Sequence, residues 1–249
     1  MTVRHGTTTT VAEADSIIMA TGIFSRPTLP KIPGILDYEG HICHSSRWSS
    51  DFDPAGKNIA VIGNGASGLQ ILPQLQKVSH RIDHYVRSPT WIANNFGGQE
   101  REKPIPQDLK SPFGDPDAYL RYRKSLENPS FSSFGNVMKD SAKSKQSRAN
   151  IHEIMKARLG GRTDLLAAIE PDFSPSCRRL TPGPWYLEAL TQSNVEYITT
   201  GIERFTKSGI KTVDGKERDV DAIICCTGSE KTFSPPFPIV NRRIDLASA

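Results

Sequence analysis

The apolar positions between residues 57 and 91 follow the order strand, glycine turn, helix and strand. Residues 59–62 form an uninterrupted apolar run that leads directly into Gly63, and leucines then recur at helical spacing. Residues 81–87 have the composition of a second strand, which would end in Arg87. Because these elements span about thirty residues, the size of one βαβ unit, the pattern predicts a parallel sheet in this region.

Before and after this unit the pattern changes. The short apolar run 16–20 predicts a strand that ends at Thr21 and Gly22, and the prolines within residues 26–34 predict an extended surface segment without helix. Residues 97–166 are polar and predict a helical insertion. Helices are predicted at 117–126 and 151–159, with the charge-rich run 139–148 between them. The residues expected to break the helical stretches are Pro112, Gly114, Pro116 and Pro129.

The last third of the chain returns to short strands. A helix is predicted at 186–190, a strand at 195–199 and a buried strand at 220–226 that ends in Thr227 and Gly228. Between them an Asp-Gly pair at 214–215 separates two short runs and predicts a hairpin turn. Together the segments predict an α/β fold, a Rossmann-like parallel sheet with a helical insertion.

Composition and charge exclude several classes of function. The 249-residue chain has a formal net charge of +4 with its basic residues spread along it, so no nucleic-acid partner is expected. No apolar run approaches the ~20 residues of a membrane span, and the first residues lack the apolar stretch of a secretory signal, so we expect a cytoplasmic protein. The four cysteines form no C-x-x-C pair, and the neighbours Cys225 and Cys226 point to opposite faces of a strand. We therefore expect inert thiols and no metal site.

Gly63-x-Gly65-x-x-Gly68 stands between a predicted strand and a predicted helix, the context that a dinucleotide-binding fingerprint requires. Gly63 permits a tight turn, Gly65 lets a pyrophosphate approach the backbone, and Gly68 allows helix and strand to pack closely. The helix N-terminus offers N–H groups and a partial positive charge to the phosphates. Ser67 and Gln70 complete the expected cofactor-binding set at this helix. The alternative is a purely structural glycine turn.

Arg87 and Ser88, at the end of the second predicted strand, indicate which dinucleotide binds. An NAD site would carry Asp or Glu at this point to bind the ribose 2′-hydroxyl. An arginine pairs instead with a 2′-phosphate, through a bidentate geometry that lysine does not match. The sequence therefore favours NADPH over NADH; the alternative is an exposed surface arginine.

A second motif, Tyr38-x-Gly40-x-x-x-His44-x-x-x-Trp48, precedes the glycine turn. By itself its histidine would be a structural loop residue. The motif closely resembles the F-x-G-x-x-x-H-x-x-x-W fingerprint of Baeyer–Villiger monooxygenases, with Tyr38 in place of the usual Phe. The resemblance is clear over residues 11–96 and 171–240 and faint in the insertion. The family's other features occur in the same order: Ala20-Thr21-Gly22, Arg26-Pro27-x-x-Pro30-x-Ile32-Pro33-Gly34, the glycine turn, Arg87-Ser88-Pro89-Thr90-Trp91, Cys177-Arg178-Arg179-Leu180 and Cys226-Thr227-Gly228.

The resemblance implies a class B flavin monooxygenase, in which an NADPH domain is inserted into an FAD domain. In such enzymes NADPH reduces the flavin, and oxygen from O₂ is inserted next to a ketone of a small organic substrate. The implied segments are 1–53 (part of the FAD domain and linker), 54–225 (NADP-binding domain) and 226–249 (the returning FAD domain). Thr21, Gly22, Thr227 and Gly228 would then lie near the linkers and contact cofactor.

The resemblance also assigns roles to individual residues. Arg179 matches the family's active-site arginine, whose cation would stabilise anionic oxygen species. Arg178 matches a neighbouring basic residue that contacts the 2′-phosphate; without the resemblance the two arginines would be a solvated surface pair. His44 and Trp48 match fingerprint residues that couple domain movement to catalysis. Trp185 stands where the family often has a small residue.

Parts of the family pattern are missing from this sequence. A second G-x-G-x-x-G, which would hold the FAD pyrophosphate, does not occur in it, so the resemblance predicts a chain truncated at both ends. Two interpretations stay open: part of an FAD- and NADPH-dependent monooxygenase, or a catalytically inactive NADP(H)-binding module or partial gene model. A flavin disulfide reductase would need a pair of redox cysteines at close spacing, which the sequence lacks.

Overall fold

The computed structural model describes residues 2–16, 18, 20, 22–93, 114–138, 140–178, 180–231, 237, 239–241 and 244–245 of the 249-residue chain. The chain forms two compact units. One consists of Met1–Thr28 together with Ser229–Ala249, and the other of Leu29–Gly228. The larger unit holds the glycine turn.

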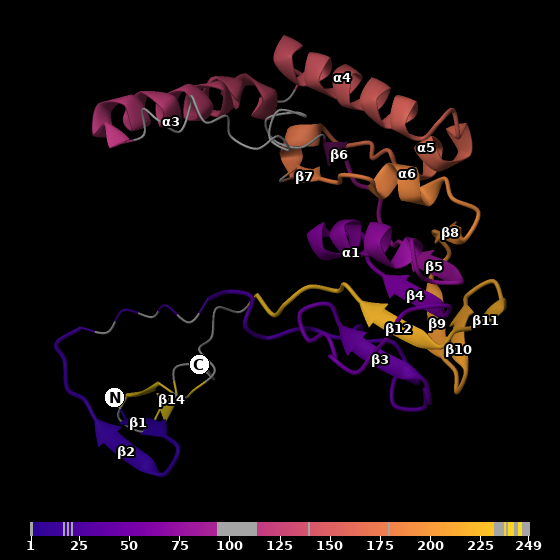
Figure 1. The fold of residues 1–249 in the computed structure, drawn as a ribbon, viewed down its shortest axis with the longest axis horizontal. Helices are drawn as coiled ribbons and strands as arrows, with labels where there is room; N and C mark the ends of the chain where they lie inside the picture. The colour runs from indigo at the N-terminus through magenta and orange to yellow at the C-terminus, as the bar shows by residue number, and fades with distance from the viewer. Residues whose placement is uncertain are drawn as a thin grey trace. The chain divides into compact units, whose positions relative to one another are not determined.

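A parallel sheet lies at the centre of the larger unit (Figure 1). Among the described residues its strands run in the order β3 (His41–His44), β12 (Ala222–Cys225), β4 (Asn58–Ile62), β5 (Arg81–Tyr85) and β8 (Val195–Ile198), and every neighbouring pair is parallel. The chain goes from β4 outward to β5 and later returns to pair β12 on the other side of β4. The strand order therefore reverses between β4 and β12, as in a Rossmann fold, which confirms the predicted fold class.

The two faces of the sheet are covered differently. Along β4, Ile59 and Val61 belong to one apolar cluster, and Ala60 and Ile62 to the other, because successive side chains of a strand point to opposite faces. The first cluster packs against α1 (Ala66–Gln76) and α6 (Tyr186–Leu190). The second packs against an antiparallel meander whose strands are β9 (Ile202–Phe205), β10 (Gly209–Thr212) and β11 (Glu217–Asp219). Figure 1 shows α1 against β4 and β5, with α6 and α4 beyond it.

The predicted hairpin at residues 214–215 is present between β10 and β11. Gly215 has φ 85°, a conformation that glycine adopts without strain, and the Thr212 N–H donates to the Lys216 carbonyl across the turn. The Asp214 carboxylate accepts the Thr212 hydroxyl at 2.6 Å. The local turn signal was thus sufficient to place this element.

The polar insertion is helical, with bounds that differ from those predicted. Its elements are α3 (Pro116–Phe131), the 3-10 helix η3 (Ser132–Val137), α4 (Ala142–Arg158), α5 (Thr163–Ile169) and η4 (Pro175–Cys177), and β6 (Ile92–Ala93) pairs with β7 (Thr181–Pro182) at its ends. Residues 97–113 of the predicted insertion lie outside the described residues.

Two predictions about the insertion were wrong. Pro116 and Pro129 do not break α3: the first opens the helix, where its missing N–H costs nothing, and the helix continues past the second to Phe131. The charge-rich run 139–148 does not separate two helices, because α4 already begins within it at Ala142. Ser141 caps that helix by accepting the Ser144 N–H at 3.0 Å.

The described residues of the smaller unit include two short antiparallel strand pairs. These are β1 (Thr2–His5) with β2 (Thr8–Val11), and β13 (Val240–Asn241) with β14 (Ile244–Asp245). A single bridge joins Pro27 to Ser229, and an ion pair of 3.4 Å joins Arg26 to Glu230 beside it. The strand predicted at 16–20 is not found at its described positions: Ser16, Ile18 and Ala20 lie outside any strand, and no described strand pairs with them.

The units also differ from the predicted segmentation at residues 53 and 225. The larger unit begins at Leu29, because β3 pairs with β12 in the central sheet and Tyr38 packs in its core. The proline-rich segment contains no helix, as predicted, but Ile32 packs against the sheet cluster and the Pro33 carbonyl accepts the Phe205 N–H at 2.8 Å. Residues 29–34 of this segment are therefore part of the larger unit's structure rather than a free linker.

Candidate functional site

The loops that follow β3, β12, β4 and β5 meet at one edge of the sheet. Cys225 of β12 is paired with both His44 and Ile62, and Ile62 is paired with Tyr85, so these strands end at the same level. In open α/β sheets, ligands bind beside the carboxyl ends of the strands where the strand order reverses. Most of the predicted site residues follow these four strand ends, and we call this place the carboxyl edge.

The glycine turn after β4 has the geometry that its residues predict. Gly63 has φ 101°, and its N–H donates to the Tyr85 carbonyl at 2.9 Å. A Cβ atom on Gly63 would lie 2.7 Å from the Cys226 carbonyl oxygen, and one on Gly68 would collide with the Gly63 carbonyl oxygen. Both glycines are therefore needed for the close approach of turn, helix and neighbouring strand.

Gly65 leaves open space at the N-terminus of α1. It is extended, with φ −71° and ψ −177°, and no heavy atom beyond its chain neighbours lies within 4 Å of the position a Cβ would take. No side chain caps α1, and its first turn carries no acidic residue. The first N–H groups of the helix therefore have no partner within the helix and present a partial positive charge to the carboxyl edge. Ser67 is exposed there, and the Gln70 amide donates to the Ala66 carbonyl at 2.8 Å.

Arg87 lies on the turn after β5 rather than in the strand, which ends at Tyr85 and not at residue 87 as predicted. Within the described part of the chain its exposed side chain has neither an ion pair nor a hydrogen bond. The turn is connected to the glycine loop by Asn64, whose Nδ2 donates to the Ser88 carbonyl at 3.0 Å. The dinucleotide fingerprint leaves the position between its first two glycines unspecified, so the sequence pattern assigns no role to Asn64.

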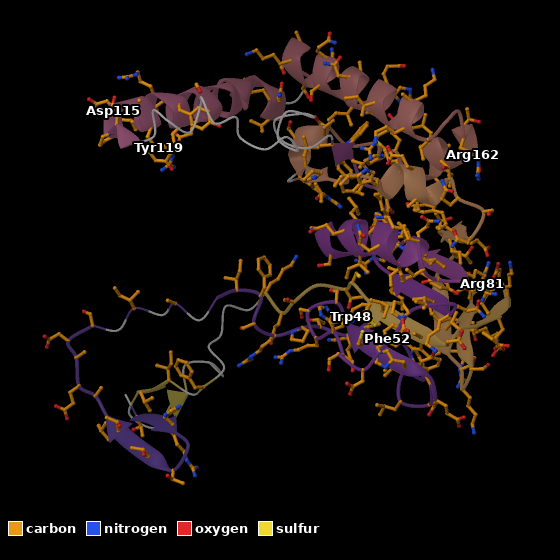
Figure 2. All side chains as sticks on the ribbon, viewed as in Figure 1. Trp48, Phe52, Arg81, Asp115, Tyr119 and Arg162 are labelled. Atoms are coloured by element: carbon orange, nitrogen blue, oxygen red, sulfur yellow. The ribbon has the colours of Figure 1, made fainter. Side chains whose placement is uncertain are left out.

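The motif around His44 is partly structural. The Tyr38 ring occupies the space that a Cβ on Gly40 would fill, and the Tyr38 hydroxyl donates to the Val220 carbonyl at 2.8 Å. Trp48 lies edge-on against Phe52, with ring centroids 5.7 Å apart (Figure 2). Trp48 as a whole residue is 42% exposed.

His44 itself is buried at the carboxyl edge. The Ser46 N–H donates to its Nδ1 at 3.2 Å, so Nδ1 is an acceptor and the proton of the neutral ring is on Nε2. That Nε2 atom is buried and has no partner among the described residues. A buried donor without a partner is costly, so this N–H is available to a group that reaches the edge.

The remaining predicted residues are placed as follows. Arg179 and Thr21 lie outside the described residues. Gly22 is exposed, with φ 77°, in the smaller unit, while Thr227 and Gly228 follow β12 at the carboxyl edge. The guanidinium of Arg178 lies 4.5 Å from the centre of the Phe173 ring.

The buried thiols have no reactive character. Burial raises the pKa of Cys225 to about 12 and that of Cys226 to about 11, so both remain protonated near neutral pH. No group of three metal-ligating side chains occurs among the described residues. In that same part of the chain, no helix has the length and apolar character needed to cross a bilayer.

The chain is similar to known flavin-dependent proteins. Residues 3–105 match the family model described as pyridine nucleotide-disulphide oxidoreductase. The chain is 35% identical to the FAD-binding monooxygenase tazF of Aspergillus terreus, over 94% of this chain and 43% of that protein. It is 31% identical to a Baeyer–Villiger monooxygenase of Streptomyces coelicolor, over 89% of this chain and 42% of that protein. The chain thus spans less than half the length of these relatives.

A solved structure supports the fold. The crystal structure of OTEMO in complex with FAD and NADP superposes with a TM-score of 0.71 over 86% of this chain and 47% of that one, at 24% sequence identity. At this identity the likeness establishes the fold, including the central parallel sheet.

Proposed function

The chain belongs to the flavin-dependent monooxygenases, the family that includes the Baeyer–Villiger enzymes, and we propose that its Leu29–Gly228 unit binds NADPH for such a monooxygenation. The observation that carries this proposal is the carboxyl edge, where an open glycine turn and an arginine with no partner among the described residues lie beside the point at which strand order reverses. The reaction proposed for the whole protein is oxygen insertion next to a ketone of a small organic molecule.

The described residues fit NADPH. The space above Gly65 and the N–H groups of the first turn of α1 suit a pyrophosphate, because the helix dipole and free donors both favour an anion. Arg87 suits the 2′-phosphate, since it is exposed, unpaired among the described residues and joined to the glycine loop through Asn64. Arg178 is proposed as a second cation for this phosphate.

FAD is proposed as the second cofactor, because the relatives are named for binding it. Only one strand, glycine turn and helix unit occurs among the described residues, and it is assigned to NADPH. The described residues of the smaller unit form hairpins and offer no helix N-terminus to a second pyrophosphate. We therefore assign no flavin contact to them, and Thr21, Gly22, Thr227 and Gly228 remain proposed cofactor contacts from the family motifs alone.

When bound, NADPH supplies a hydride and FAD supplies the oxygen chemistry, so the protein's task is binding and orientation. Gly63 and Gly68 hold the glycine turn close to the sheet, and α1 and Arg87 bind the negative charges of the dinucleotide. His44 is proposed to position a group through its free Nε2–H rather than to transfer a proton, because Ser46 occupies its Nδ1. Arg179 remains the proposed active-site cation.

The test combines binding with spectroscopy. The purified chain is titrated with NADP⁺ and with NAD⁺, and tighter binding of NADP⁺ is expected. The chain is then incubated with FAD, freed of excess cofactor and treated with NADPH in air with a cyclic ketone. A retained flavin that NADPH bleaches, together with ester formation, would support the monooxygenase. Selective NADP⁺ binding without retained flavin would support the NADP(H)-binding module instead, and equal affinity for the two nucleotides would refute the NADPH site.

A further inference from the structure

We infer that Asn64 is a positioning residue for cofactor preference: its side-chain amide connects the glycine turn to the turn that carries Arg87. This inference rests on the proposed NADPH site and goes beyond it, because the fingerprint assigns no role to this position. It concerns how the site distinguishes a 2′-phosphate from a 2′-hydroxyl.

The turn after β5 has few other attachments. The Val86 N–H donates to the Ile198 carbonyl at 2.8 Å, and the Thr90 N–H donates to the Ile169 carbonyl at 3.1 Å. Between these points, the bond from Asn64 Nδ2 to the Ser88 carbonyl is the only hydrogen bond to residues 87–89 from the described part of the chain. The backbone that carries Arg87 is therefore held to the glycine turn by this one side chain.

The position of that backbone matters for Arg87. A bidentate arginine–phosphate contact requires the planar guanidinium in one orientation, and a long side chain on a loose turn loses more conformational entropy when it forms that contact. The glycine turn does not depend on Asn64 in the same way, because the Gly63 N–H is bonded to the Tyr85 carbonyl independently. Loss of the Asn64 amide should thus weaken the 2′-phosphate contact and spare the pyrophosphate contacts.

The experiment measures the ratio of NADP⁺ to NAD⁺ affinity in the purified full chain by calorimetric titration. Asn64→Ala should lower NADP⁺ affinity by about three- to tenfold, the range expected for one hydrogen bond, and leave NAD⁺ affinity unchanged. In an Arg87→Ala background, Asn64→Ala should have no further effect on the ratio. Asn64→Gln, which keeps the amide donor, should recover part of the preference.

Asn194→Ala is the matched structural control. The Asn194 amide also donates to backbone carbonyls, those of Gln76 and Ser79, but it precedes β8 at the opposite edge of the sheet. This variant should lower the melting temperature and leave the affinity ratio unaltered, which separates positioning from general destabilisation.

Other results of these titrations would contradict either the role of Asn64 or the NADPH site. Equal losses of NADP⁺ and NAD⁺ affinity in Asn64→Ala would mean that Asn64 supports the pyrophosphate site and not Arg87. An unchanged ratio, or an effect that persists without Arg87, would also refute the inference. A wild-type chain that does not prefer NADP⁺ would refute the proposed function itself, so the two failures are distinguishable.

Discussion

Gly63 and Cys226 approach each other at the point where the order of the sheet reverses: a Cβ atom on Gly63 would lie 2.7 Å from the Cys226 carbonyl oxygen. The Cys226 N–H in turn donates to the Ile62 carbonyl at 2.8 Å, so the ends of β4 and β12 are joined directly below the glycine turn. This contact needs both a positive φ and a missing side chain at Gly63, so Gly63 has a structural role, whereas Gly65 is proposed to face the pyrophosphate.

Gly63→Ala and Gly65→Ala are expected to fail in different ways. Gly63→Ala should lower the free energy of unfolding by about 1–3 kcal/mol, because alanine is strained at this φ and its methyl group meets Cys226. Gly65→Ala should cost no more than about 1 kcal/mol, since Gly65 is extended with open space around it. Its methyl group would instead occupy the proposed pyrophosphate space and weaken NADP⁺ and NAD⁺ alike. Urea unfolding and nucleotide titration of both variants check this, and unchanged nucleotide affinity in Gly65→Ala would contradict it.

Arg87→Ala should reduce NADP⁺ affinity by about 1.5–3 kcal/mol, the contribution of a hydrogen bond to a charged group, and leave NAD⁺ affinity nearly unchanged. Arg162→Ala is the control, because Arg162 is another exposed arginine whose ion pair with Asp164 lies in the helical insertion. Titration with both nucleotides measures the effect. Equal losses of the two affinities in Arg87→Ala would exclude a 2′-phosphate contact.

His84 should make the fold sensitive to acid. It is fully buried, its Nδ1 donates to the Val61 carbonyl at 3.2 Å, and it accepts the Tyr186 hydroxyl on Nε2 at 2.9 Å. Burial lowers its pKa to about 4 in the folded protein, against 6.5 in the unfolded chain. Between these values the unfolded state binds more protons, so the neutral ring's contribution is complete above pH 6.5 and is lost as the pH falls towards 4.

The full effect of this titration is about 3 kcal/mol. Urea unfolding between pH 7.5 and 4.5 should show the stability advantage of the wild type over His84→Gln shrinking as the pH falls. A difference between the two proteins that stays constant over this range would mean that His84 does not titrate as its burial predicts.

Trp185 provides a test of backbone strain. It has φ 59° at the N-terminus of α6, a left-handed conformation that is unfavourable for a bulky side chain, and the residue is 56% exposed. Trp185→Ala keeps the strain and removes the indole, whereas Trp185→Gly also removes the strain. The glycine variant should therefore be more stable than the alanine variant by about 1 kcal/mol, measured by thermal or urea unfolding. An alanine variant as stable as the glycine variant would show that this backbone is not strained.

Several elements could be predicted from the sequence because their signals are local. The strand, glycine turn and helix at residues 59–76 are contiguous, and the hairpin at 214–215 depends on a glycine that adopts a positive φ. The predicted helix at 186–190 coincides with α6. In each case a few neighbouring residues determine both the backbone conformation and the face that is buried.

Sequence-based predictions failed where the conformation depends on more than the nearest residues in the sequence. Pro129 predicts a break in the helix, but loss of one hydrogen bond does not end a helix that otherwise continues. The apolar residues at 16–20 predicted a strand, yet a strand requires a hydrogen-bonding partner, and the described residues provide none. β5 ends at Tyr85 because the parallel ladder with β4 and β8 ends there.

The sequence by itself determined the βαβ unit and the glycine conformations, and it predicted an arginine near the end of the second strand, since each depends on residue type and local spacing. Only the tertiary structure decided that β3 joins the same sheet beside β12, that His44 therefore reaches the carboxyl edge, and that Asn64 holds the turn of Arg87. The hydrogen bond from Asn64 to Ser88 connects residues 24 positions apart, and the one from Tyr38 to Val220 connects residues 182 positions apart. The pairing of β3 with β12 likewise joins strands that are distant in the sequence. Periodicity records which side chains are buried, whereas the choice of partner depends on which strand edges and hydrogen-bonding groups remain free once the chain has folded.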